Sequence, residues 1–400
     1  MMAYCKEFFG LDDEFFKERS CINTASEIAS QPGLWKELGS MLLEQKPRIA
    51  GFMERIIKEV NGLGNLRIVL TGAGSSAFIG EALAHFAAKA SKIKCEAIHT
   101  TDMVSAPETV LFGDIPTLLI SFARSGNSPE SVGAVEYARK TVKKLYEAAV
   151  VCDGTSKLHN VTAENKNSLV LVMPEGSNDK GFAMTSSVSC MLLAGFALLN
   201  FSKIDEIAKD IDLLSKNIDN AALSLSKKAS ACAEIAFDRA VYLSSGAFKG
   251  LSHEGSLKMM ELSNGAVFSS FDSSTGFRHG PKTVIKDNAL SLHFISDDPF
   301  SSKYDMDLLS ELYREKKKNA VIALCGENTK GVEADEVVIL PQAGYGFASH
   351  LCLGISGLVF FQMLAMHKSI ALGITTDSPS PGGQVNRVVK GVTIYPYQSR

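Results

Sequence analysis

The sequence contains no pair of cysteines at Cys-x-x-Cys spacing, although eight cysteines are scattered along its 400 residues. Several of them, such as Cys152 and Cys190, lie inside apolar runs. This pattern is typical of buried free thiols in a reducing compartment, and it excludes a disulfide framework or a cysteine-rich zinc site. The first ten residues also lack the basic stretch and following apolar stretch of a secretory signal. We therefore expect a cytoplasmic protein.

A basic excess is missing too, because the formal net charge is −3. This balance argues against nucleic acid as the main partner. No apolar run reaches the roughly 20 residues that a membrane-spanning helix needs. The longest, from Leu351 to Met366, is interrupted by glycine, serine and glutamine. We expect it to form a buried helix and expect no membrane partner.

The sequence does contain enough apolar residues for a large core, since 46% of it is hydrophobic and 21% is charged. A chain of 400 residues exceeds the usual size of a single core, so two domains are expected. Residues 1–60 read as an amphipathic helical segment with a break at Gln31-Pro32-Gly33.

From residue 66 onward, short β-branched strands alternate with helices. Such alternation is typical of a parallel, doubly wound sheet in an α/β protein. The expected helices cover 76–90, a segment starting at 129, and 184–201, and the expected strands cover 66–71, 117–122, 148–154 and 169–174.

The same order of landmarks recurs about 170 residues later, which indicates an internal duplication. The segments 69–72, 118–122, 150–154, 169–174 and 181–183 match 242–245, 292–296, 322–326, 337–341 and 346–348. We expect two tandem α/β domains, each a three-layer αβα arrangement around a parallel sheet. The expected bounds are 61–205 and 206–400, after the helical segment 1–60.

Two loops of the first copy are rich in glycine and serine, and each follows an expected strand. They are Gly72–Ser76 and Arg124–Ser131. Ligands of open parallel sheets bind at the carboxyl ends of strands, where glycines and helix N-termini can approach an anion. Neither loop has the Lys-Ser/Thr ending of a nucleotide-binding P-loop, so a phosphate without a nucleotide is favoured. In the plainer interpretation, these residues only form turns and helix caps.

The second copy carries charged residues at the matching places. Glu254, Lys258 and Glu261 lie on one helical stripe, which would otherwise be an ordinary solvated Glu–Lys pair. The loop Thr275–Lys282 places Arg278 and His279 between glycines. A histidine titrates near neutral pH, so this loop favours proton transfer, although a loop histidine is more often merely exposed.

These motifs resemble the sugar isomerase (SIS) family, whose fold occurs twice in glucosamine-6-phosphate synthase. The resemblance rests on GAGSS, SGNS, HEGSLKMMELSNG, FRHGPK and NRVVKGVTIYP, which lie in the family's order over residues 50–400. FRHGPK, SFARSGNSPES and SPSPGG are further similar to one branch, the tagatose-6-phosphate ketose/aldose isomerases, whose members act as galactosamine-6-phosphate deaminases and isomerases.

The resemblance implies a role for each matching residue. Glu261 would move a proton between C1 and C2 of the sugar, His279 would open the ring, and Glu254 would line the site. Lys258 and Lys390 would lie near the substrate's oxygens. The phosphate would be held by hydroxyl and amide groups of the first copy: Ser75, Ser76, Ser125, Asn127 and Ser128.

The chain departs from the family pattern at two positions. Ala123 stands where the family has a hydroxyl, and the neighbouring Arg124 would supply a charged phosphate contact instead. Arg278 replaces the lysine before the histidine and is expected near the substrate. Family members place the histidine loop and the C-terminal tail near a neighbouring subunit, which implies a homodimer or a larger homo-oligomer.

The expected reaction is deaminating isomerisation of galactosamine 6-phosphate to tagatose 6-phosphate. Residues 1–60 leave no room for the ammonia-producing domain of the synthase, so the expected protein either releases ammonia from an amino-sugar phosphate or interconverts a ketose and an aldose. The resemblance to the branch favours ammonia release. A carboxylate base with flanking cations suffices for this chemistry, and we expect neither a cofactor nor a metal. Two alternatives stay open: a ketose/aldose phosphate isomerase that does not deaminate, and a non-catalytic sugar-phosphate sensor.

Overall fold

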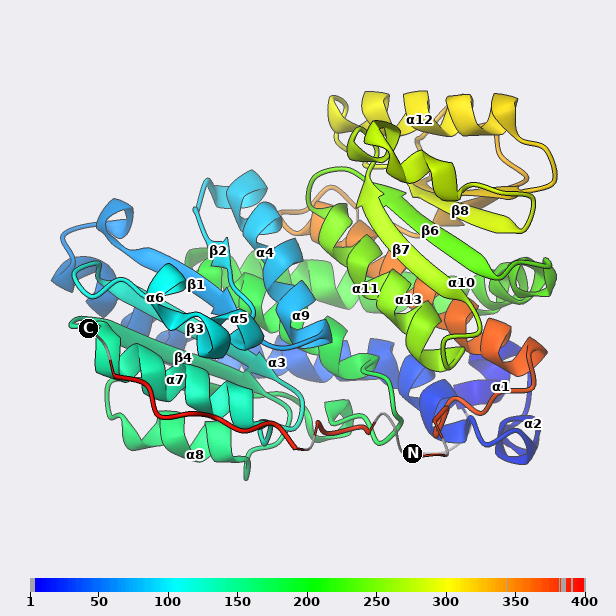
Figure 1. Ribbon diagram of the computed structural model, residues 1–400. Helices are drawn as coiled ribbons and strands as arrows, with labels where there is room; N and C mark the ends of the chain where they lie inside the picture. The colour runs from blue at the N-terminus through cyan, green and yellow to red at the C-terminus, as the bar shows by residue number, and fades with distance from the viewer. Residues whose placement is uncertain (1–3, 343, 381, 383–385, 390, 399–400) are drawn as a thin grey trace. The chain divides into compact units, whose positions relative to one another are not determined.

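The computed structural model describes residues 4–342, 344–380, 382, 386–389 and 391–398. The chain divides into two compact units, each of which holds one five-stranded parallel sheet (Figure 1). The predicted domain bounds follow the sequence repeat, whereas the two compact units are defined by contacts between residues. The predicted bounds therefore stay a prediction. We call the units by their sheets: the first-sheet unit comprises Leu34–Asn178, Ser186–Lys209 and Val385–Arg400, and the second-sheet unit comprises Met1–Gly33, Asp179–Thr185 and Asp210–Gln384.

The two sheets have the same strand order, β2-β1-β3-β4-β5 and β7-β6-β8-β9-β10 when each is read from the corresponding edge. All neighbouring strands within each sheet are parallel. The identical strand order confirms the predicted duplication of an α/β domain. The strands are β1 (Arg67–Thr71), β2 (Glu96–Ala97), β3 (Thr117–Ala123), β4 (Leu145–Val151), β5 (Leu169–Val172), β6 (Arg239–Ser244), β7 (Phe268–Ser273), β8 (Ala289–Phe294), β9 (Ala320–Gly326) and β10 (Glu336–Leu340).

Helices cover both faces of each sheet. On the first sheet, α4 (Ser75–Ser91) and α9 (Ser186–Leu199) pack on one face, and α5 (Thr100–Ser105), α7 (Pro129–Thr141) and α8 (Lys157–Glu164) pack on the other. On the second sheet, α11 (Phe248–Leu262) and α13 (Ser349–Ala371) pack opposite α12 (Ser301–Glu315). The remaining helices are α1 (Tyr4–Phe9), α2 (Asp13–Glu18), α3 (Ile22–Glu59), α6 (Pro107–Val110) and α10 (Ile204–Glu234).

The central strands are buried on both faces, which explains their largely apolar sequences. Every residue of β3 and of β9 is buried. The apolar helix α13 is long enough to cross a bilayer, but 89% of its apolar window is buried inside the protein. It is therefore a core helix, as the sequence predicts. All eight cysteines are free, and only Cys95 is not fully buried.

The predicted break at Pro32 was wrong, because α3 continues from Ile22 to Glu59 without interruption. Proline has no N–H, so the carbonyl oxygen of Ile28 loses its normal helical donor. The side chain of the buried Gln31 replaces that donor: its Nε2 atom lies 3.2 Å from this oxygen and 2.8 Å from Oε1 of Gln362. A neighbouring side chain thus compensates for the missing backbone bond.

The duplicated Gly-Phe-Ala segments are held in similar ways, each by a carboxylate from a long helix. Glu27 on α3 accepts a hydrogen bond from the backbone N–H of Gly181 at 2.9 Å. Asp210 on α10 accepts one from the N–H of Ala348 at 2.7 Å. Burial raises the pKa of Glu27 to about 8. The duplication therefore extends to the carboxylates that anchor the last loop of each copy.

Helix α13 packs so closely on β8 that Gly357 has no room for a side chain. A Cβ atom at this position would lie 2.4 Å from Cζ of Phe294. We predict that Gly357→Ala lowers the free energy of unfolding by about 1–3 kcal/mol through overpacking. Urea denaturation followed by circular dichroism measures this change.

Gly33 on α3 provides the matched control, because a Cβ there would meet nothing within 4 Å. Gly33→Ala is expected to leave stability unchanged or to raise it by up to about 1 kcal/mol through helix propensity. Equal stability of the two variants would contradict the close packing of α13 on β8.

Candidate active site

The serine-rich loops follow the carboxyl ends of β1 and β3, and the His279 loop follows the carboxyl end of β7, whereas Lys258 and Glu261 lie in the C-terminal half of α11. The first-sheet unit carries the serine-rich loops, and the second-sheet unit carries the acid–base residues. Lys390 lies outside the described residues. Each unit is therefore considered by itself.

The first loop turns sharply from β1 into α4. A Cβ at Gly72 would lie 2.5 Å from the carbonyl carbon of Ser76, and Gly74 has a positive φ of 55°. Both positions thus require glycine. Ser75 and Ser76 occupy the first turn of α4, at the positive end of the helix dipole. The backbone N–H groups of Ser76 and Ala77 donate to the carbonyl oxygens of Ala73 and Gly74 at 3.2 and 2.8 Å. Such a turn is suited to binding an anion.

The second loop connects β3 to α7 and is shaped by its own hydrogen bonds. Gly126 has a positive φ of 57°, and a Cβ there would lie 2.4 Å from Oγ of Ser156. Oδ1 of Asn127 accepts a hydrogen bond from the N–H of Lys157 at 3.1 Å. The hydroxyl groups of Ser128 and Ser131 are 2.8 Å apart. The loop is therefore held in one conformation before any ligand binds.

Arg124 has a protein partner in this loop. Its side chain is only 7% exposed, and its Nη2 atom donates to the carbonyl oxygen of Arg387 at 2.8 Å. Arg387 in turn donates to Oδ1 of Asn178 at 3.1 Å. Arg124 thus connects the serine-rich loop to the C-terminal tail, a contact that the sequence motif does not reveal.

The C-terminal tail packs along α7 (Figure 1). The hydroxyl of Tyr137 donates to the carbonyl oxygen of Tyr395, and its ring lies 5.1 Å from that of Tyr397. A Cβ at Gly133 would lie 3.1 Å from Ile394. Helix α7 therefore provides a fitted surface for the tail.

In the second-sheet unit, α11 holds a buried cluster of three charges. Lys258 is fully buried, and its ammonium lies 3.2 Å from Oε1 of Glu254 and 2.6 Å from Oε2 of Glu261. Burial lowers the pKa of Lys258, but the two carboxylates outweigh burial and hold this pKa above its ordinary value. Lys258 is therefore a fixed cation and is not a general base.

The two carboxylates of this cluster differ in exposure. The side chain of Glu254 is 1% exposed, whereas that of Glu261 is 26% exposed. Glu261 is therefore the member of the cluster that a substrate can reach. The sequence left open a solvated Glu–Lys pair at these positions, and the burial of Lys258 excludes it.

The loop with His279 is fixed on both sides of the histidine. Phe277 is buried in a core cluster with Leu308 and Leu312 of α12. Nε of Arg278 donates to Oε2 of Glu311 at 2.8 Å. His279 itself is exposed. The loop thus presents an imidazole from a rigid backbone, and Arg278 is engaged by a glutamate of α12.

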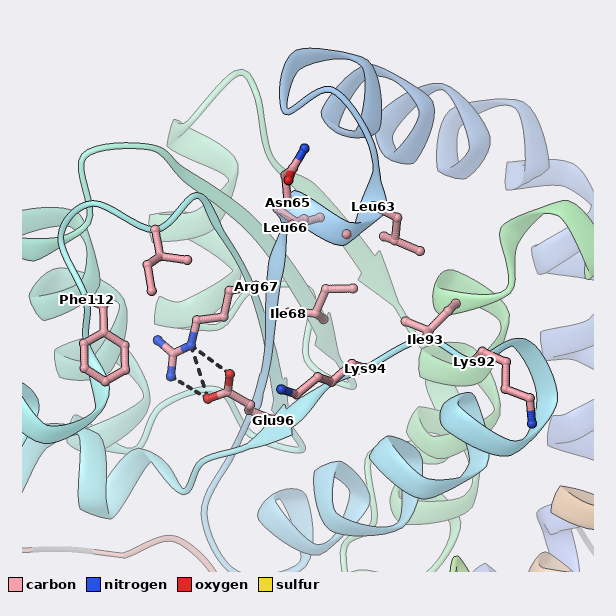
Figure 2. Close-up of a pocket in the computed structure, with 12 residues that line it drawn as sticks. Leu63, Asn65, Leu66, Arg67, Ile68, Lys92, Ile93, Lys94, Glu96 and Phe112 are labelled. Atoms are coloured by element: carbon pink, nitrogen blue, oxygen red, sulfur yellow. Dashed lines mark hydrogen bonds and ion pairs between the residues drawn. The ribbon is translucent and has the colours of Figure 1, made fainter.

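A cavity of about 570 Å³ lies at the opposite edge of the first sheet, where β1 and β2 begin (Figure 2). Its main charged feature is an ion pair between Arg67 and Glu96, with Nη2 and Oε2 2.7 Å apart. Arg67 also donates to the carbonyl oxygen of Val110 at 2.7 Å. Because Glu96 and Val110 accept the hydrogen bonds of the Arg67 guanidinium, we interpret this ion pair as structural. The loops at the carboxyl edge of the sheet therefore remain the candidate site. No cluster of metal-binding side chains occurs among the described residues.

Comparisons with known proteins support the same family. The SIS domain model matches residues 65–200. The D-galactosamine-6-phosphate deaminase AgaS of Shewanella sp. is 38% identical over 94% of this chain and 92% of its own length.

Solved structures show the same relationship over nearly the whole chain. The tagatose-6-phosphate ketose/aldose isomerase of Escherichia coli superposes with a TM-score of 0.85 at 34% identity, over 94% of this chain and 97% of its own. A protein of Clostridium novyi, provisionally named as a tagatose-6-phosphate ketose/aldose isomerase, superposes with a TM-score of 0.92 at 39% identity. The match covers 99% of this chain and 100% of the Clostridium novyi chain. The chain therefore belongs to the SIS-domain proteins, in the branch that contains AgaS and the tagatose-6-phosphate ketose/aldose isomerases.

Proposed function

We propose that this protein is a cytoplasmic enzyme that converts galactosamine 6-phosphate and water into tagatose 6-phosphate and ammonia. The observation that carries the proposal is the Glu254–Lys258–Glu261 cluster, in which a buried cation holds one accessible carboxylate. The similarity to relatives named as D-galactosamine-6-phosphate deaminases supports the choice of substrate. We further propose that it acts as a homodimer or a larger homo-oligomer.

The first-sheet unit binds the phosphate in this proposal. The N-terminal turn of α4 offers the positive end of the helix dipole together with Ser75 and Ser76. The loop before α7 adds Ser125, Asn127 and Ser128. The conformation of both loops is fixed by glycines and internal hydrogen bonds, so little ordering is needed when phosphate binds.

The second-sheet unit performs the proton transfers. His279 donates and accepts the protons of ring opening, which exposes the C1 aldehyde. Glu261 then removes the C2 proton and returns it to C1 through an enolamine, leaving an iminium at C2. Water adds to this iminium, the C2–N bond breaks, and ammonia leaves. Glu254 and Lys258 act through Glu261, and Lys390 and Arg278 are proposed to contact substrate oxygens.

A second candidate is isomerisation without deamination, because the solved relatives are named as ketose/aldose isomerases. The deciding experiment mixes purified protein with galactosamine, glucosamine and N-acetylgalactosamine 6-phosphates and measures free ammonia. Ammonia from galactosamine 6-phosphate is the expected result. Conversion between tagatose 6-phosphate and an aldose phosphate without any ammonia release would favour the second candidate, and no turnover of any sugar would favour a sensor.

The role of Glu261 predicts a separation of turnover from binding. We expect Glu261→Gln to lower kcat by about 10²- to 10⁴-fold, because the amide cannot accept the C2 proton. The affinity for the sugar phosphate, measured by calorimetry, should stay within a few-fold of the wild type. Glu333→Gln, at an exposed glutamate of the same unit, is the control and should be fully active. Undiminished turnover in Glu261→Gln would remove Glu261 from the mechanism.

The role of the serine loops predicts the opposite pattern. Ser125→Ala should raise KM for galactosamine 6-phosphate by about 10- to 100-fold, because a hydrogen bond to a charged phosphate is lost. It should also weaken competitive inhibition by inorganic phosphate, while kcat changes less. Ser105→Ala, at an exposed serine of α5, should change neither quantity. If Ser125→Ala leaves both KM and phosphate inhibition unchanged, the loop does not bind the phosphate.

The burial of Lys258 predicts a large effect on stability. Lys258→Met leaves Glu254 buried beside no cation and should lower the free energy of unfolding by about 3–5 kcal/mol. The double variant Glu254→Gln/Lys258→Met should recover much of this loss in urea denaturation. Lys216→Met removes an exposed pair with Asp212 of similar spacing and should cost less than about 0.5 kcal/mol. Similar losses for Lys258→Met and Lys216→Met would contradict the buried cluster.

A further inference from the structure

The described part of the C-terminal tail, 386–389 and 391–398, is anchored at two places on the first-sheet unit of its own chain. At one place, the guanidinium of Arg124 donates to the carbonyl oxygen of Arg387 at 2.8 Å. At the other, the hydroxyl of Tyr137 donates to the carbonyl oxygen of Tyr395. Arg124 begins the serine-rich loop before α7, and Tyr137 lies on α7 itself. The tail therefore runs from the loop proposed to bind phosphate along the helix that follows this loop (Figure 1).

Arg387 of the tail faces the carboxyl ends of three neighbouring strands. Its carbonyl oxygen accepts from Arg124, which directly follows β3, and its side chain donates to Oδ1 of Asn178, beyond the end of β5, at 3.1 Å. Strand β4 lies between these two strands and is followed by Asp153. Hydrogen bonds from Thr155 lower the pKa of Asp153, and the positive charge of Arg387 lowers it further. Arg387 is thus within electrostatic reach of the loop after β4 as well.

The second copy of the fold joins its strand ends from within. Asp305 on α12 is 1% exposed, and it accepts hydrogen bonds from the hydroxyls of Ser245 and Ser274 and from the backbone N–H of Ser296. These serines follow β6, β7 and β8. In the first copy, the loops after β3, β4 and β5 converge instead on Arg387, a residue of the tail. The tail is therefore a part of the carboxyl edge of the first sheet.

Arg124 provides a firm anchor for the tail. Its own loop is fixed by the positive φ of Gly126 and by the contact between the hydroxyls of Ser128 and Ser131. A hydrogen bond from a charged donor is also stronger than one between neutral groups. Because only 7% of Arg124 is exposed, little of its surface is open to a ligand. Its position thus favours a role toward the tail over a role toward the phosphate.

We propose that Arg124 is a positioning residue that docks the C-terminal tail across the strand ends of the first sheet, and that it acts through the tail and not by contact with the substrate's phosphate. This role rests on the proposed function, in which the serine loops bind the phosphate and Lys390 of the tail contacts substrate oxygens. Loss of the Arg124 guanidinium should therefore free the tail and slow turnover, while the affinity for phosphate is kept.

Limited trypsin digestion of the full chain without substrate, read by mass spectrometry, tests the anchor. Arg124→Met should release residues 388–400 about 10-fold faster than the wild type, because cleavage after Arg387 requires the tail to leave its anchor. Tyr137→Phe frees the other place of attachment and should speed the release about threefold. Arg48→Met, at an exposed arginine of the same unit, is the control and should change nothing. An unchanged release from Arg124→Met, or an equal rise at every trypsin site, would overturn the proposal.

Binding of inorganic phosphate, measured by calorimetry, separates positioning from direct contact. Arg124→Met should keep the Kd for phosphate within about threefold of the wild type, whereas loss of a charged phosphate contact would raise it about 10-fold or more. The kcat for galactosamine 6-phosphate should fall about 10- to 100-fold through the misplaced tail. Ser125→Ala should show the reverse, with weaker phosphate binding and wild-type release of the tail. A Kd raised more than about threefold in Arg124→Met would overturn the proposal and make Arg124 a phosphate ligand.

If Arg124→Met does not fold, Arg124→Gln replaces it, because glutamine stays polar but is shorter than arginine and carries no charge. An Arg124→Gln variant with wild-type release of the tail and wild-type kcat would overturn the proposal. Absence of ammonia release by the wild type would refute the proposed function, and absence of phosphate binding would refute the phosphate site. The rate at which trypsin releases the tail tests the anchor independently of both.

Discussion

The chemistry proposed for this protein depends on one buried ammonium group. Lys258 has no exposed surface, and it is tolerated only because Glu254 and Glu261 neutralise it from two positions on the same helix. The two carboxylates differ in exposure, because Glu254 is buried and Glu261 lies at the surface of the cluster. The three- and four-residue spacing of these charges on one helix thereby holds the proposed base in a fixed orientation.

The rest of the second-sheet unit supports this arrangement. Helix α11 is packed against α13 so closely that Gly255 has no room for a side chain, since a Cβ there would lie 2.6 Å from Phe361. The start of α11 is tied to Asp305, and the His279 loop is tied to the same helix α12. The acid–base residues thus come from elements whose backbones are fixed by packing and by buried hydrogen bonds. The first-sheet unit has the same topology but offers glycines and serines at its strand ends. In the proposed function, one fold used twice serves as a phosphate-binding copy and a proton-transfer copy.

The sequence predicted most of the fold because the central strands are buried on both faces. Strands such as β3 and β9 are largely apolar, and the repeated order of such segments revealed the duplication. The edge strands β2 and β7 were missed, since β2 has two residues and four of the six residues of β7 are polar. The break expected at Pro32 did not occur, because Gln31 supplies the missing donor through its side chain. Such a compensation depends on three-dimensional contact and leaves no periodic signal.

The sequence motifs predicted which residues form the candidate site, but they did not predict which of these residues are buried. The spacing of Glu254, Lys258 and Glu261 fits a solvated stripe as well as a buried cluster, and only the packing of α11 decides between them. Asp305 is one acid in an amphipathic helix, so no sequence pattern distinguishes it from the exposed Asp307. The contact of Arg124 with Arg387 joins residues far apart in the chain.

The central claim is that Lys258 stays charged inside the protein. Nitrogen NMR of protein labelled at the lysine Nζ atoms, with the Lys258 signal assigned from Lys258→Met, measures this charge directly. The account predicts that Lys258 remains an ammonium up to and beyond its ordinary pKa of 10.5, because its pKa is raised by the two carboxylates. A Lys258 signal that loses its proton well below that pH would contradict the account.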